Sequence, residues 1–211
     1  MNRTTIINLL AKKINAKSYL EIGVRLHSAN FDKINIDHKV GVDPCLEAFD
    51  REPTYKLTSD DFFTKNKETF DIIFIDGLHE SEQVGRDINN SLLCLNKGGY
   101  IVCHDMNPAK EYRQFTLNNP KRKEFVKKTK DTLWNGDCWK AFVKLRKERN
   151  DITMHTVDTD FGCAIISHGK QELLNIQQED INYQNLEKNR KKWLNLISIE
   201  EFFCKFIKYI N

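Results

Sequence analysis

The sequence predicts an α/β protein with a Rossmann-like, doubly wound sheet that is mostly parallel and ends in an antiparallel hairpin. Short apolar runs at 71–75 and 99–103 do not alternate with polar residues, which is typical of strands buried on both faces. The stretch between them, Ser81 to Leu95, repeats its apolar residues at helical spacing instead. Runs of these two kinds in alternation favour a parallel sheet with helices on its faces, with further helices at both ends of the chain.

The first half of the chain is expected to supply the parallel part of this sheet. A helix is predicted over residues 3–15, where Ile6, Ile7, Leu10 and Ile14 form an apolar stripe. Strands are predicted at 18–22, 38–42, 54–57, 71–75 and 99–103. Lys97-Gly98-Gly99 is expected to close the helix over 81–95, because a glycine commonly follows the last helical residue.

The second half is expected to finish the sheet and to add helices. Residues 106–135 are polar, basic and weakly periodic, which indicates a lid or an insertion, and a helix is predicted over 136–149. Residues 153–157 and 161–167, joined by Asp158-Thr159-Asp160, are predicted to form the hairpin. Two or more helices are predicted over 170–211. We therefore expect one α/β domain over 1–169 and a C-terminal helical extension, 170–211, packed on it.

Composition excludes several classes of protein. A net charge of +3 is too mild to demand a nucleic-acid partner, and no window approaches the roughly 18 apolar residues of a membrane helix. The N-terminus does not resemble a signal peptide, and six scattered cysteines without a Cys-x-x-Cys pair favour a reduced, cytoplasmic location. The strongest basic cluster lies in 121–130. A solvated helix face is the favoured interpretation, and contact with an acidic substrate is the alternative.

Two strand ends point to a nucleoside cofactor. Glu21-Ile22-Gly23 ends one run, and Val40-Gly41-Val42-Asp43 ends the next about twenty positions later. At the carboxyl edge of a parallel sheet these place a glycine turn beside a carboxylate that can accept hydrogen bonds from a ribose diol. Only one glycine occurs in Gly23 to Ser28, so a pyrophosphate cradle of the Gly-x-Gly-x-x-Gly kind is poorly supported.

With these strand ends, two further blocks carry a resemblance to a known family. They are Phe74-Ile75-Asp76-Gly77-Leu78-His79 and Gly98 to Asp105. Over roughly 18–167 the chain resembles class I S-adenosylmethionine (SAM)-dependent methyltransferases, and more narrowly the sugar and small-molecule O-methyltransferases related to macrocin O-methyltransferase. The resemblance departs at two places. His27 stands where a second glycine is usual, and His104-Asp105 stands where metal-dependent relatives have Asp-Asp or Asp-Asn.

The resemblance implies that 1–169 binds SAM. The first glycine turn is expected to contact the methionine part, and the acid that ends the second strand to hold the ribose. Asp60, in the Ser59-Asp60-Asp61 stretch, could bond the adenine amine, although a helix cap is as good an interpretation. The predicted cofactor-binding residues are Glu21, Gly23, Asp43, Asp60 and Asp76.

The chemistry is expected at the ends of two adjacent strands. Asp76, His79, His104 and Asp105 should open on one crevice, where methyl transfer to a hydroxyl needs alignment and removal of a proton. In one arrangement Asp76, His104 and Asp105 bind Mg²⁺ or another divalent cation. In the other, His79 or His104 is the general base. Asp76, His79 and His104 are the predicted catalytic residues.

The sequence therefore predicts a SAM-dependent O-methyltransferase that acts on a small molecule, with a sugar or glycan favoured by the resemblance. Two alternatives stay open at this point. One is a nicotinamide-dependent Rossmann oxidoreductase, and the other is a non-catalytic binding module with the same fold. The acceptor is expected to lie against 106–140. The oligomeric state is not predicted.

Overall fold

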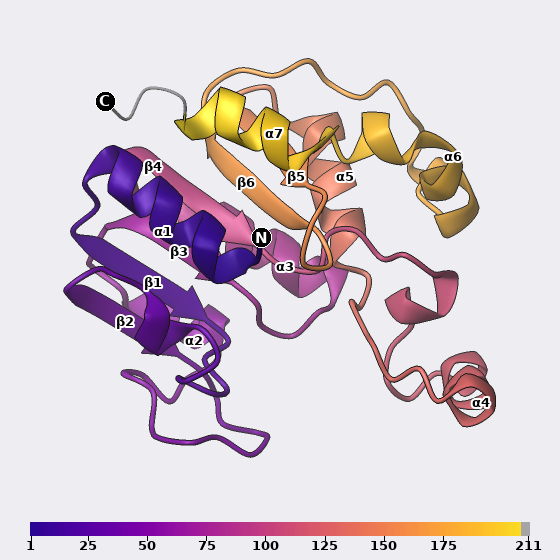
Figure 1. Ribbon diagram of the computed structural model, residues 1–211, viewed down its shortest axis with the longest axis horizontal. Coiled ribbons are helices and arrows are strands. Elements are labelled where there is room, and N and C mark those ends of the chain that lie inside the picture. The colour runs from indigo at the N-terminus through magenta and orange to yellow at the C-terminus, as the bar shows by residue number, and fades with distance from the viewer. Residues whose placement is uncertain (208–211) are drawn as a thin grey trace.

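The computed structural model describes residues 1–207 and contains one seven-stranded sheet with the order β2-β1-β3-β4-β6-β5-β7 (Figure 1). The strands are β1 (Ser18–Ile22), β2 (His38–Val42), β3 (Phe70–Ile75), β4 (Leu95–Cys103), β5 (Ile152–Val157), β6 (Cys163–His168) and β7 (Leu196–Ile197). Every neighbouring pair is parallel except those made by β6, which runs antiparallel to both β4 and β5. The predicted mixed, mostly parallel sheet is confirmed.

Helices cover both faces of the sheet, as the doubly wound prediction requires. They are α1 (Arg3–Ile14), α2 (Ser59–Lys65), α3 (Ser81–Leu93), α4 (Pro120–Thr129), α5 (Cys138–Glu148), α6 (Tyr183–Trp193) and α7 (Ile199–Phe202), with a π-helical turn at Phe203–Ile207 and short 3₁₀ turns between. One apolar cluster joins α1, α7 and the π-helical turn to the sheet, and a second joins α2, α3, α5 and α6 to the other face. Side chains of β3 alternate between the two clusters because successive strand residues point to opposite faces.

Two predictions at the first half of the sheet are wrong. Residues 54–57 form no strand, and only Tyr55 makes an isolated parallel bridge, to Val42. Gly98 and Gly99 do not close a helix, because α3 already ends at Leu93 and both glycines lie inside β4. The β3–β4 register shifts between Phe70 and Ile72, and a Cβ on Gly99 would come within 2.5 Å of the Asp71 carbonyl oxygen. The glycines therefore serve a β-bulge, where backbones approach closely.

The C-terminal segment adds to the sheet as well as covering it. β7 pairs in parallel with β5, so 170–207 is not purely helical as the sequence suggested. Tyr183, Leu186 and Trp193 of α6 are buried in the cluster that also holds α3 and α5. The division into 1–169 and 170–211 stays a prediction. Residues 208–211, at the end of that predicted extension, lie outside the described residues.

Two observations bear on the predicted environment. Across residues 1–207 no helix combines the length and apolar character that crossing a bilayer requires. The six cysteines, all of which are described, are free thiols.

Candidate active site

Gly23 lies where β1, β2 and β3 end side by side. Its N–H donates to the Val42 carbonyl oxygen over 2.8 Å, which places Gly23 next to Asp43 at the same sheet edge. Its φ is +94°, and a Cβ there would lie 2.2 Å from the backbone oxygen of Asp76. Only glycine fits both the conformation and the close approach. The turn predicted to bind the cofactor is thus in direct backbone contact with Asp76, one of the predicted catalytic residues.

The other predicted cofactor residues lie in different surroundings. Asp43 is half-buried, and its Oδ1 accepts from Cys45 N over 2.6 Å. Asp60 is at the start of α2, where it pairs with Arg86 of α3 at 3.3 Å. Glu21 is 3% exposed and accepts from Tyr19 Oη over 2.5 Å and Asn30 Nδ2 over 2.9 Å. Glu21 and Asp60 thus already have partners within the protein. Cofactor contacts by Glu21, Gly23, Asp43, Asp60 and Asp76 all stay predictions.

The structure brings Asp76, His79, His104 and Asp105 together. Asp76 follows β3, and His104 and Asp105 follow the neighbouring strand β4. His104 Nδ1 lies 2.9 Å from Asp105 Oδ2 and 3.4 Å from Asp76 Oδ1. His79 Nε2 lies 3.2 Å from Asp76 Oδ1, and its Nδ1 lies 3.5 Å from Asp105 Oδ2. Two carboxylates and two imidazoles therefore form one cluster beside the glycine turn.

Unusual backbone conformations aim two of these side chains. His79 and Asp105 have φ values of +47° and +64°, in the left-handed region that non-glycine residues seldom occupy. Gly136 lets the start of α5 approach this loop, because a Cβ there would lie 2.0 Å from the His79 carbonyl oxygen. Asp137 then accepts from Ser81 N over 2.7 Å, while its own N–H donates to His79 O over 3.2 Å. The loop that carries His79 is thus fixed to α5.

The electrostatics of the cluster follow from burial and mutual contact. Burial raises the pKa of Asp76, but the charge and hydrogen bonds of His104 and His79 outweigh it and hold that pKa well below its ordinary value. Burial lowers the pKa of His104, yet Asp76, Asp105 and Asp160 raise it well above the ordinary histidine value. The pKa of His79 is raised by Asp76 and Asp105 against the effect of burial. The carboxylates therefore raise the pKa of both imidazoles, and the imidazoles in turn hold that of Asp76 down.

The donor set fits a divalent cation, with His79 rather than His104 as the clearest third ligand. Asp76, His79 and Asp105 each offer one ligand atom, and these atoms lie within 4.8 Å of one another. His79 Nδ1 is buried and has no hydrogen-bond partner among residues 1–207. Two carboxylates with an imidazole are a recognised set for such ions. The predicted triad of Asp76, His104 and Asp105 stays a prediction.

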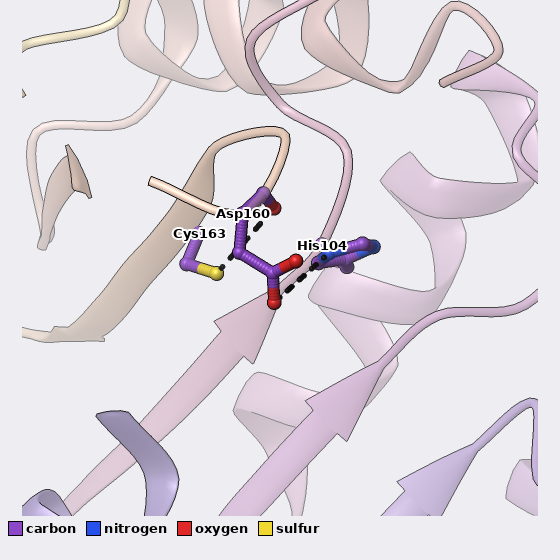
Figure 2. A group of neighbouring side chains, drawn as sticks. All are labelled: His104, Asp160 and Cys163. Carbon is purple, nitrogen blue, oxygen red and sulfur yellow. Dashed lines mark hydrogen bonds and ion pairs between the residues drawn. The ribbon is translucent and has the colours of Figure 1, made fainter. Parts of the chain in front are cut away.

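His104 is drawn into a second group on its other side. Figure 2 shows the Asp160 carboxylate between His104 and Cys163, with His104 Nε2 at 3.6 Å from Asp160 Oδ2. The three offer ligand atoms within 4.8 Å of one another. Arg3 already supplies a cation there, because its Nη1 lies 2.7 Å from His104 Nε2 and its backbone N–H donates to Asp160 over 2.8 Å. This group is therefore neutralised from within the chain.

Comparison with known proteins is consistent with this edge of the sheet being a cofactor site. Residues 11–106 match the family model described as a methyltransferase domain. This match covers a little under half of the chain, from the last part of α1 to the residues that follow β4. This confirms the class that the sequence predicted, while the narrower branch around macrocin O-methyltransferase stays a prediction. A search of curated proteins found no significant match.

Solved structures share the fold of this methyltransferase domain at low identity. A candidate caffeoyl-CoA O-methyltransferase from Staphylococcus aureus is 18% identical, with a TM-score of 0.52 over 80% of this chain and 85% of its own. An O-methyltransferase from Bacillus cereus, in complex with SAH, is 15% identical, with a TM-score of 0.51 over 80% and 82%. TomG, an O-methyltransferase from Streptomyces achromogenes involved in tomaymycin synthesis and solved with SAM, is 12% identical, with a TM-score of 0.52 over 79% of each chain.

Several residues of the candidate site are not indicated by the sequence. Asn135 is fully buried and donates to Asp105 Oδ1 over 2.9 Å, and the Trp134 ring stacks on His79 with centroids 4.8 Å apart. Both belong to the weakly periodic stretch 106–135, where no pattern singles them out. Arg3 and Asp160 lie more than fifty residues from the blocks they contact. No local signal could have found them.

Proposed function

We propose that this protein is a SAM-dependent O-methyltransferase that transfers a methyl group to a hydroxyl of a small molecule or sugar. The observation that supports this most strongly is the contact between Gly23 and the Asp76 backbone. It joins the turn expected to hold the cofactor to the cluster of acids and imidazoles. A methyl donor bound at one and a hydroxyl bound at the other would be neighbours, as in-line transfer requires.

Each half of the site has a distinct task in this proposal. When bound, SAM supplies an electrophilic methyl group on a sulfonium. The Gly23 turn would hold its methionine part, and the Asp43 carboxylate would hold its ribose. Asp76, His79 and Asp105 would hold a divalent cation, which lowers the pKa of a hydroxyl bound to it. Because metal ligands must be deprotonated, binding there competes with the proton on His79.

His79 is the better general base if the acceptor is deprotonated without a metal. Its side chain is 18% exposed, while that of His104 is 5% exposed and faces Arg3 and Asp160. A base must come within hydrogen-bond reach of the proton it removes. The stacked Trp134 ring beside His79 would offer an apolar face to an acceptor.

The nicotinamide alternative finds no support. The turn after β1 contains a single glycine, and the matched domain is a methyltransferase. The sugar character of the acceptor rests on the sequence resemblance alone. Transfer to oxygen is supported also by the O-methyltransferases that share the fold.

Titration calorimetry tests the cofactor half of this proposal. We expect S-adenosylhomocysteine (SAH) and SAM to bind the purified protein, and NADH not to bind. Transfer of a labelled methyl group from SAM to catechols, phenols and free sugars, with and without Mg²⁺, then tests the acceptor half. Binding of NADH without binding of SAH would refute the proposal. Labelled product on an amine or thiol, and on no hydroxyl, would refute O-methylation.

A further inference from the structure

The loop after β1 has an anchor that the sequence did not suggest. His27 stands where a second glycine was expected, yet its side chain is only 3% exposed and turns into the protein. Its ring packs edge-on against Phe31, with centroids 5.2 Å apart. The His27 side chain is thus part of the protein interior beneath the loop that follows β1. A second group, from another segment, holds the backbone of this loop.

That group is the carboxylate of Asp50, which lies on the loop after β2. Asp50 Oδ1 accepts from His27 N and lies 3.0 Å from both His27 N and His27 Nδ1, and Oδ2 accepts from Ser28 N over 3.2 Å. These hydrogen bonds hold the pKa of Asp50 far below its ordinary value, so the carboxylate is ionised at any working pH. A charged acceptor that takes two successive backbone N–H groups fixes the path of a loop.

Two further pairs join the same segments. Arg25 lies 3.0 Å from Glu47, and Arg51 pairs with Asp32. Both are exposed, so each contributes little by itself. The segment 25–32, which follows Gly23, and the segment 47–51, which follows Asp43, are therefore connected at three points. The Asp50 bonds are the only ones of these that reach the backbone.

We propose that Asp50 is a positioning residue for the cofactor: by holding the N–H groups of His27 and Ser28, it fixes the loop that follows the Gly23 turn. This rests on the proposed function, because the cofactor it serves is SAM. A loop held in its bound shape loses less conformational freedom on binding, and affinity rises accordingly. Asp50 does not need to touch the cofactor for this effect.

The test compares Asp50→Ala, Asp50→Asn and the control Asp37→Ala. Asp37 is an exposed carboxylate just before β2, at the far end of that strand, and its side chain has no hydrogen bond or ion pair within residues 1–207. We expect Asp50→Ala to weaken SAH binding by about tenfold, Asp50→Asn to weaken it less because one acceptor oxygen remains, and Asp37→Ala to leave it unchanged. Urea unfolding of the free proteins should differ little among the three.

Amide hydrogen exchange adds a readout without ligand. In free Asp50→Ala protein, the amides of His27 and Ser28 should exchange faster than in the parent, while those of β1 keep their rates. No SAH binding by the parent protein would overturn the proposed function together with this inference. Equal or tighter SAH binding by Asp50→Ala, with normal binding by the parent, would overturn the inference alone. Lower stability with unchanged affinity would make Asp50 merely structural and would also overturn it.

Discussion

Asp76 belongs to both halves of the site. Its backbone oxygen closes on Gly23, and its carboxylate lies within 3.4 Å of nitrogens of His79 and His104. The nearby carboxylate of Glu21 has other surroundings. It is buried and accepts hydrogen bonds from Tyr19 and Asn30, not from the histidines. Residues of one chemical type at one sheet edge thus have separate tasks, set by burial and by partners.

The buried Glu21 should make stability depend on pH. Burial raises its pKa from 4.5 to about 7, so the folded protein binds a proton that the unfolded chain releases. The resulting stabilisation is full below pH 4.5 and is lost as pH rises to about 7, by about 3 kcal/mol. Glu21→Gln, which cannot ionise, should remove this decline. Urea unfolding of both proteins at pH 5 and pH 8 measures it, and identical pH dependences would contradict the assignment.

We expect His79 to be a metal ligand, with the metal ion and a proton competing for its imidazole nitrogen. With Mn²⁺ as the probe, calorimetry should show that His79→Ala binds at least about tenfold more weakly than the parent protein. Because the pKa of His79 is raised, binding to the parent should strengthen as pH rises from 6 to 8. The control is His38→Ala, since His38 is exposed at the other end of β2 and pairs with Glu68. Equal Mn²⁺ affinity of His79→Ala and the parent would exclude His79 as a ligand.

At the scale of elements, the site depends on how α3 and α5 meet. Glu80, the residue before α3, makes no side-chain cap, and Asp137 at the start of α5 accepts from the Ser81 N–H instead. One carboxylate therefore satisfies a free N–H of one helix and fixes that helix to another. The His79 loop runs directly into this junction, so the α3–α5 contact orients the candidate catalytic side chain of His79.

Gly85 offers a way to strengthen this contact. It lies inside α3, where glycine costs conformational entropy, and a Cβ there would meet Ala141 Cβ at 3.9 Å, an ordinary contact. Gly85→Ala should therefore raise the free energy of unfolding by about 0.5–1 kcal/mol, measured by urea denaturation. Gly136→Ala is the opposite case, because its Cβ would collide with the His79 carbonyl oxygen, and it should destabilise the protein. A destabilised Gly85→Ala protein would show that the contact between α3 and α5 has no room for the added alanine Cβ.

At the scale of the whole molecule, the two ends of the described chain pack together. α1, α7 and the π-helical turn lie on one face of the sheet (Figure 1) and share one apolar cluster. The start of α1 also reaches the site, where Arg3 contacts His104 and Asp160. The segment after α6 therefore supports the helix that carries Arg3.

Phe202 should show how much this packing contributes. It is fully buried in the apolar cluster that α1 and α7 share with the sheet, so Phe202→Ala should lower the free energy of unfolding by about 3–5 kcal/mol. The neighbouring Phe203 is 40% exposed, and Phe203→Ala should cost well under half as much. Denaturant unfolding of both variants gives the comparison. Similar losses for the two would mean that the C-terminal segment does not pack as described.

Local pattern was enough for most of the sheet. β1 and β2 have the predicted bounds, and α1 and α3 begin at the predicted residues 3 and 81, because burial on one or two faces leaves a period in the sequence. The predictions for 54–57 and for Gly98-Gly99 were wrong for a shared reason. A short apolar stretch or a glycine pair has several local uses, and only the neighbouring strand decides among a strand, a bridge and a bulge.

By itself, the sequence determined the doubly wound class, the glycine turn at residue 23 and the gathering of Asp76, His79, His104 and Asp105. Each follows from strand ends that must share one edge of a parallel sheet. Tertiary structure alone decided which groups touch them: Arg3 and Asp160 at His104, Asn135 at Asp105, and Asp50 at His27. Such contacts join residues 23 to 101 positions apart, and no periodicity within a segment encodes a partner outside it.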